Sequence, residues 1–244
     1  MATTPEAYVH LSTDKTTLTF YYDTLRADRN GTTWGIRDWD AFFSCPAWAG
    51  DFNPRNTTVL TAVFDASFRD FRPTTTEGWF YELNLLERIE GLEHLNTSQV
   101  TSMGWMFKGC GSLTSLDLTR FDTSQVTDME EMFSGCESLI ALDLSSFDTS
   151  EVSYMRGMFS GCKSLTTLDL SSFDTSNVTD MRGMFYSCES LTTIYCNSSW
   201  SDRLSDDMFS GCNSLRGAAT NVGNSYDVSM ANPETGYFTK KVLS

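Results

Sequence analysis

The sequence predicts an α/β repeat protein: a right-handed leucine-rich-repeat solenoid with a parallel β-sheet on one face, short helical turns on the other, and an N-terminal β-hairpin cap. The main observation is a 26-residue unit that starts at residues 106, 132 and 158 and changes little between copies. Each copy carries leucines in the spacing Leu-x-x-Leu-x-Leu, as in residues 113–118. A period of about 20 to 29 residues with this spacing is typical of leucine-rich solenoids.

Stacking of the units follows from the repeat itself. One unit cannot bury its own leucines, so each must lie against the next, and the chain becomes a rod of about six coils. We expect residues 57–216 to form this solenoid, because weaker copies of the unit flank the regular ones. Residues 1–56 are expected to form a β-rich N-terminal cap, and residues 217–244 a C-terminal cap and tail.

Each coil divides into a strand, a turn and a helical segment. The Leu-Asp-Leu segment at 116–118 alternates apolar and polar residues, which predicts a strand. Asp, Thr and Ser at 122–124 favour a bend, in which the Asp carboxylate accepts backbone N–H groups. Apolar residues then recur every three or four positions over 126–136, which predicts a short helical turn.

The first part of the chain is irregular. Alternating apolar and polar residues over 8–22 surround a Ser-Thr-Asp-Lys turn and predict a β-hairpin. Leu60 lies 26 residues before Leu86, and Val63 lies 26 residues before Ile89. This spacing predicts an extra coil that begins near residue 57.

Five aromatic residues lie close together after the hairpin. They are Trp34, Trp39, Phe42, Phe43 and Trp48. Two interpretations stay open: they cover the first coil as part of a cap, or they form an aromatic platform for a carbohydrate or a peptide.

Five of the seven cysteines share one position of the repeat. Their apolar neighbours and odd number favour buried free thiols over disulfides, and no Cys-x-x-Cys or histidine cluster indicates a metal site. They are Cys110, Cys136, Cys162, Cys188 and Cys212.

The composition excludes several classes of partner. A formal net charge of −15 and an isoelectric point near 4.4 argue against nucleic acid and anionic membranes, which need a basic surface. The sequence contains no apolar run of about 20 residues, so we expect no membrane insertion. Its start lacks the pattern of a signal peptide, so the chain is either cytoplasmic or a segment without its leader.

The repeat resembles a known family. The unit MFSGCKSLTTLDLSSFDTSNVTDM, the lead-in IEGLEHLNTSQVTSM and the late GYFT are similar to the BspA-like leucine-rich-repeat surface proteins of host-associated bacteria. The same unit occurs in mycoplasma surface lipoproteins. The resemblance covers about residues 57–239 and implies a protein at the cell surface or secreted, with a role in adhesion or host-protein binding.

One acidic column is a candidate site. Asp117, Asp143 and Asp169 occupy the same repeat position, and Tyr195 ends the column. We expect these side chains on the open face of the sheet, about 5 Å apart. The alternatives are an ordinary solvated ladder, a site for Ca²⁺, and a pair of catalytic carboxylates.

The pattern favours a non-enzymatic binding or adhesion-type protein without cofactor or metal, whose partner is a protein or a glycan. The competing hypothesis is a passive spacer or self-assembling element of a bacterial surface. Small residues repeat on the expected sheet face, as at 115, 141 and 167, and they offer no anchor. Specific binding would therefore use the acidic column together with Tyr195 and Trp200, or the N-terminal aromatic residues.

Overall fold

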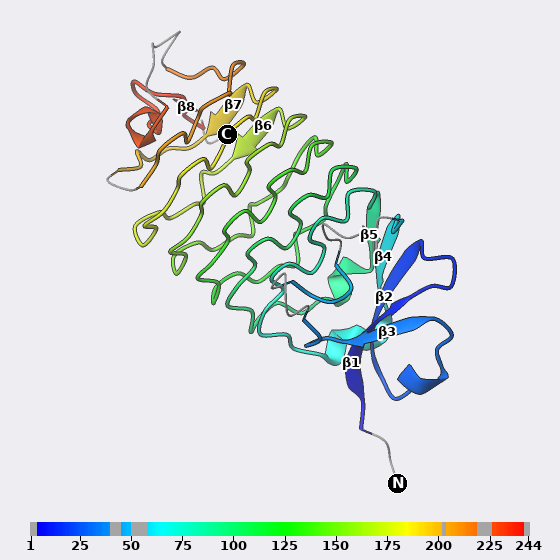
Figure 1. The fold of residues 1–244 in the computed structure, drawn as a ribbon. Helices are drawn as coiled ribbons and strands as arrows, with labels where there is room; N and C mark the ends of the chain where they lie inside the picture. The colour runs from blue at the N-terminus through cyan, green and yellow to red at the C-terminus, as the bar shows by residue number, and fades with distance from the viewer. Residues whose placement is uncertain (1–3, 40–44, 50–57, 202–203, 219–225, 242–244) are drawn as a thin grey trace.

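The coils stack along one axis, from an N-terminal sheet to the C-terminal end (Figure 1). This computed structural model describes residues 4–39, 45–49, 58–201, 204–218 and 226–241. Buried leucine, methionine and phenylalanine side chains run through the whole stack as one continuous core. The leucine-rich-repeat type of architecture expected from the 26-residue period is therefore present.

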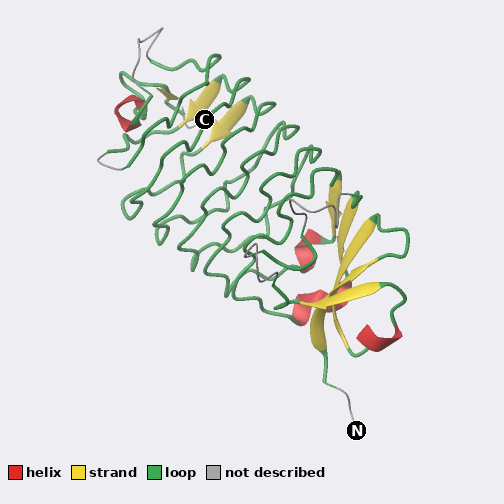
Figure 2. Cartoon of the chain, viewed as in Figure 1, coloured by secondary structure: helices red, strands yellow, loops and turns green. Residues whose placement is uncertain are grey.

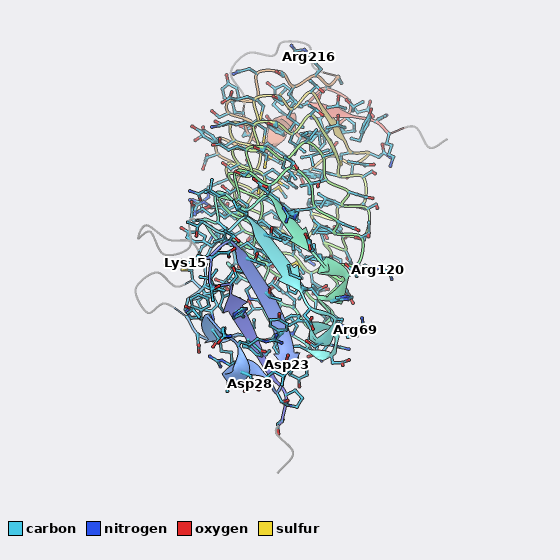
Figure 3. The ribbon with its side chains drawn as sticks, turned by 90° about the vertical axis from the view of Figure 1, so that its right-hand side faces the viewer. Lys15, Asp23, Asp28, Arg69, Arg120 and Arg216 are labelled. Carbon is cyan, nitrogen blue, oxygen red and sulfur yellow. The ribbon has the colours of Figure 1, made fainter. Side chains whose placement is uncertain are left out.

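A five-stranded sheet closes the N-terminal end, with the order β3-β1-β2-β4-β5. The hairpin expected over 8–22 is formed by β1 (Glu6–Leu11) and β2 (Thr17–Asp23), and β3 (Thr32–Gly35) pairs antiparallel with β1. Figure 3 views the rod from this end, with the sheet in front. On its other edge, β2 pairs parallel with β4 (Thr61–Phe64), which pairs parallel with β5 (Arg88–Glu90).

Aromatic packing joins this sheet to the coils. Phe20 of β2 stacks on Phe64 of β4 at 4.5 Å between ring centroids and on Trp79 at 5.4 Å. Trp48 is fully buried beside them and donates its indole N–H to the carbonyl of Trp79 (2.9 Å). Trp39 remains 39% exposed. Phe42 and Phe43 lie outside the described residues.

The first coil is present, but its register differs by one residue from the expectation. The structure pairs Ala62 with Ile89, a separation of 27 residues, so Ala62 and Phe64 point inward while Val63 is half-exposed. The expected 26-residue alignment of Leu60 and Val63 with Leu86 and Ile89 was therefore wrong by one residue. A shift of one residue turns every side chain of a strand to the other face, and an insertion in this irregular coil hides the shift from the sequence.

The parallel sheet expected on the leucine face, which comprises residues 114–119 and their equivalents such as 140–145 and 166–171, is interrupted. Strands β6 (Thr167–Asp169), β7 (Thr193–Tyr195) and β8 (Phe238–Thr239) form a second, parallel sheet, but the described segments 116–118 and 142–144 are not strands (Figure 2). Backbone bonds between coils are weaker here; the N–H of Ile140 meets the carbonyl of Thr114 at 3.5 Å. The expectation of a continuous sheet on this face is corrected accordingly.

The regular hydrogen bonding between coils lies on another flank. Parallel bridges join one residue from each coil: Thr75, Ser102, Asp128, Tyr154, Asp180 and Leu204. Beyond each bridge, every second N–H donates to the next coil, as from Met129 to Tyr154 (3.0 Å) and from Glu131 to Arg156 (2.8 Å). We call this surface the ladder face; it comprises residues 75–82, 102–109, 128–135, 154–161, 180–187 and 204–211.

The helical turn predicted over 126–136 is absent, and the ladder explains why. Only alternate N–H groups bond within the coil, such as that of Met132 to the carbonyl of Met129 (3.3 Å), because the others are used between coils. Glu131 and Gly135 also have positive φ, at 49° and 73°. A helix needs consecutive right-handed residues, so two left-handed ones within five positions prevent it. The described 3₁₀ turns lie elsewhere, at Arg26–Asp28, Ala66–Asp70, Leu92–His94 and Val228–Met230.

Phenylalanines and cysteines form two buried columns. The rings of Phe107, Phe133 and Phe159 stack almost parallel, with centroids 5.7 Å apart. The expected unbridged thiols are confirmed for the whole cysteine column. The Sγ of Cys162 donates to the carbonyl of Phe133 (3.2 Å), and burial raises its pKa to about 12. Cys212, in the last coil, is only half-buried.

The C-terminal residues complete the last coils. Strand β8 adds to β7, and Trp200 packs between Phe185 and Phe238 in the core. Lys241 reaches back to form an ion pair with Asp169. No helix in the described ranges is long and apolar enough to cross a bilayer.

Candidate functional site

The carboxylates of the acidic column lie near one another, since Asp143 acts on the pKa of Asp117 and Asp169 on that of Asp143. Asp117 and Asp143 are exposed on the leucine face, and the β6–β7 register places Tyr195 directly beside Asp169. Each carboxylate closes a local turn. The Oδ1 of Asp143, for example, accepts the N–H of Ser145 at 3.0 Å.

Local hydrogen bonds also set the titration of this column. The hydroxyl of Thr119, followed by its N–H, lowers the pKa of Asp117. At Asp169, burial acts to raise the pKa, but the bonds from Lys241 and Ser171 outweigh it and the pKa is lowered. These carboxylates are therefore ionised and already partly satisfied. Among the described residues, no cluster of three or more His, Cys, Asp or Glu side chains has the arrangement of a metal site.

Trp200 does not belong to this surface. It is 4% exposed, and its Nε1 has no hydrogen-bond partner among the described residues. The sequence placed it beside Tyr195 as a contact residue, and that assignment is wrong because the C-terminal strand covers it. Tyr195 remains half-exposed.

The ladder face carries the chemically varied side chains of the repeat. At the bridge position the successive coils hold Ser102, Asp128, Tyr154, Asp180 and Leu204. Tyr154 is 51% exposed. Two positions later the coils hold Gly104, Glu130, Arg156, Arg182 and Asp206. The leucine face, by contrast, repeats Asp and small residues.

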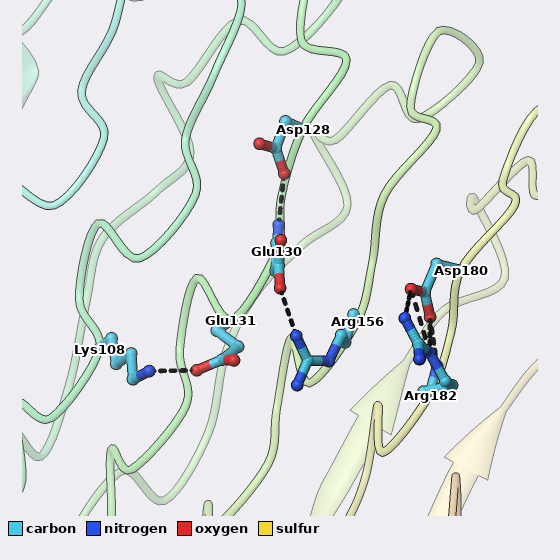
Figure 4. Close-up of polar contacts among 7 residues, drawn as sticks. All are labelled: Lys108, Asp128, Glu130, Glu131, Arg156, Asp180 and Arg182. Carbon is cyan, nitrogen blue, oxygen red and sulfur yellow. Dashed lines mark hydrogen bonds and ion pairs between the residues drawn. The ribbon is translucent and has the colours of Figure 1, made fainter. Parts of the chain in front are cut away.

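Ion pairs fix several of these side chains (Figure 4). Nη1 of Arg156 donates to Oε1 of Glu130 across neighbouring coils at 3.1 Å. Arg182 binds Asp180 through Nε and Nη2, with the shortest contact at 2.5 Å. Lys108 pairs with Glu131.

The first coils of this face bring carboxylates together. Burial raises the pKa of Glu77, and the neighbouring charges of Asp128 and Glu130 raise it further. Burial likewise raises the pKa of Glu130, although Arg156 opposes the effect.

A hollow of about 430 Å³ lies on the same face. Gly157 and Gly183 contribute its floor. They share one repeat position, which holds Glu131 in the preceding coil and Asp207 in the following coil, so these two coils have no side chain there. The remaining lining residues are Ser134, Arg156, Ser160, Arg182, Tyr186 and Asp206.

The sequence contains a signal for this surface that the search for catalytic and metal motifs did not use. Among the three regular units, much of the variation falls at 128, 130 and 131 and their equivalents. Positions that pack neighbouring coils together keep the same residue type in every coil. Positions that vary between coils are therefore not needed for that packing.

A family match covers half of the chain. The profile of the family described as "Mycoplasma protein of unknown function, DUF285" matches residues 101–224. The chain belongs to the DUF285 family. This match confirms the resemblance that the repeat indicated. The regular coils and most of the ladder face lie within the matched residues 101–224. No protein of curated function matches the sequence.

Among solved structures, this DUF285 protein is similar to three bacterial leucine-rich-repeat proteins. The T. pallidum protein TpLRR is 19% identical over 85% of this chain and 76% of that chain, with a TM-score of 0.46. A leucine-rich cell surface protein of Faecalibacterium prausnitzii A2-165 is 18% identical over 80% and 55% of the two chains, with a TM-score of 0.32. A Bacteroides ovatus leucine-rich-repeat protein is 16% identical over 86% and 68%, with a TM-score of 0.29.

Proposed function

We propose that this DUF285 protein is a non-enzymatic, adhesion-type binding module whose ladder face contacts a macromolecular partner. The observation that carries the proposal is the concentration of unlike side chains on that face. Tyr154, Tyr186 and Leu204 are exposed there between the charged residues. Tyrosine and arginine are enriched among residues that dominate binding energy, and both occur on this face.

The two histidines do not favour catalysis on this surface. His10 is in the N-terminal sheet, where its Nε2 contacts the carbonyl of Asn30 (2.8 Å), and His94 lies beside Glu93. Neither is on the ladder face. On that face Arg156 and Arg182 are engaged with Glu130 and Asp180, which suits recognition and supplies no base–nucleophile pair.

We extend the proposal to the cellular location of the protein and to the boundaries of its domains. A surface or secreted location accords with the membership of a family whose repeat occurs in mycoplasma surface lipoproteins, with a cytoplasmic protein as the alternative. We retain the division into an N-terminal cap (1–56), a right-handed solenoid (57–216) and a C-terminal cap and tail (217–244). The pairing of β2 with β4 supports a capping role for the hairpin, because it covers the open edge of the first coil.

A passive spacer is the second candidate. The uniform leucine face and the uninterrupted core favour it, since a rod that only separates other parts needs no varied surface. The varied ladder face is the observation that ranks this candidate below the binding module.

Protein and glycan arrays probed with the purified chain test the choice. Tyr154→Asp/Tyr186→Ser installs the residues of neighbouring coils, so it should fold and lose the ligands of the wild type. Asp117→Asn/Asp143→Asn/Asp169→Asn should keep them. Ligands lost only with the asparagine variant would move the site to the leucine face. No ligand on either array, together with concentration-dependent self-association, would support the spacer.

A further inference from the structure

The hollow on the ladder face has the dimensions of a short ligand segment. Neighbouring strands of a ladder lie about 4.8 Å apart, so the three steps from Glu131 to Asp207 span about 14 Å. Within that span the two coils of Gly157 and Gly183 have no side chain at this repeat position. The hollow is open to solvent, so a ligand can enter it from the surface.

The lining mixes donors with acceptors. A guanidinium has five N–H donors. In the described part of the chain, Arg156 bonds through Nη1 alone, and Arg182 through Nε and Nη2, so both keep donors for a ligand. The carboxylates of Asp206 and Asp207 supply acceptors.

One aromatic ring borders this polar lining. Tyr186 is 46% exposed, at a repeat position where the neighbouring coils hold serine. It is the one large apolar surface among the lining residues of the hollow.

We propose that the hollow binds a segment of a neutral oligosaccharide; this inference rests on the proposed binding function of the ladder face. Each sugar hydroxyl both donates and accepts, which matches alternating arginine, serine and carboxylate groups. The apolar face of a sugar ring packs against Tyr186, as its amphipathic ring allows.

Charge and polarity argue against other ligands. Three carboxylates against two arginines line the hollow, and the chain carries a net charge of −15, so sulfated or sialylated glycans are repelled. An apolar protein anchor would find no desolvated pocket to fill. A neutral polyhydroxyl ligand avoids both penalties.

The test is an array of neutral oligosaccharides (glucans, mannans, galactans and N-acetylhexosamine oligomers) with sialylated and sulfated glycans as the counter-panel. Calorimetry then measures the best neutral ligand. We expect binding to neutral glycans, weakened at least about tenfold, or about 1.4 kcal/mol, by Tyr186→Ser or Gly183→Glu. Both changes copy other coils: serine stands at 134, 160 and 210, and Glu131 has φ 49° where Gly183 has 59°.

Ile140→Thr is the matched control. It copies Thr114 and Thr166 on the leucine face, outside the lining of the hollow, and it should leave glycan affinity unchanged. Neutral glycans that bind wild type and both hollow variants equally would overturn the inference, as would a wild type that binds no neutral glycan. If proteins bind instead and Tyr154→Asp/Tyr186→Ser loses them, the ladder-face function stands while the glycan assignment fails.

Discussion

The hydroxyl of Thr123 both donates to the carbonyl of Asp148 and accepts the N–H of Asp148, each at 2.8 Å. One buried side chain thus satisfies two backbone groups of the next coil. Thr97 and Thr149 make the same pair of bonds with Asp122 and Asp174. The carboxylate of each of these aspartates accepts a hydrogen bond within its own turn, and the threonine hydroxyl bonds that turn to the preceding coil.

Removing the hydroxyl of Thr123 should destabilise the central coils. Thr123→Val keeps the shape but leaves the N–H and carbonyl of Asp148 unsatisfied, so we expect a loss of about 1–3 kcal/mol in the free energy of unfolding. Thr123→Ser retains the hydroxyl and should cost less. Denaturant unfolding of both variants measures the difference, and equal stabilities would show that the bonds contribute little.

The phenylalanine stack gives a second stability prediction. Phe133→Ala removes a fully buried ring between two others and should cost about 3–5 kcal/mol. Ile140→Ala is the control, since Ile140 is 57% exposed and should change stability by less than about 0.5 kcal/mol. Similar melting temperatures for the two variants would contradict the inward position of the ring.

The cysteines of the column should differ in their rate of reaction with a thiol reagent. Cys110, Cys136 and Cys162 are fully buried with raised pKa values, so a thiol reagent at pH 8 should reach them only in denaturant. Cys212 is half-buried and should react faster in the native protein. Mass spectrometry of labelled peptides reads out the order, and rapid native labelling of Cys136 would place the column on the wrong side of the coil.

Calcium tests the acidic column. We expect millimolar Ca²⁺ to leave the melting temperature unchanged, because Asp117 and Asp143 are exposed, widely solvated and already bonded to Thr119 and Ser145. A ligand that binds only the folded state would raise it. An increase that disappears with Asp143→Asn would establish a cation site on the leucine face.

We expect Glu77 to lower the stability of the protein as the pH rises through the pKa that this residue has in the folded state. Burial and neighbouring carboxylates raise its pKa in the folded protein above the unfolded value, so between these two values the native state binds more protons than the unfolded state. Its contribution to stability is favourable below the unfolded pKa and is lost above the folded one. Glu77→Gln should therefore raise the melting temperature at pH 7 more than at pH 4. An equal effect at both pH values would refute this.

The sequence by itself determined the parts of this protein that repeat. The 26-residue period and the leucine spacing identified the stacked coils, and the shared positions of the cysteines and of Asp122, Asp148 and Asp174 identified free thiols and turn-forming carboxylates. These features follow from local chemistry repeated in register, so each coil supplies the same evidence.

Only the tertiary structure decided where the coils bond and which surface they expose. Alternate N–H groups of residues such as Met129 and Glu131 bond to the next coil, and left-handed residues interrupt the turn, so a helix-like pattern of apolar residues forms a ladder. Trp200 is buried because a segment almost forty residues later covers it. Both outcomes depend on contacts between distant parts of the chain, which a local pattern does not contain.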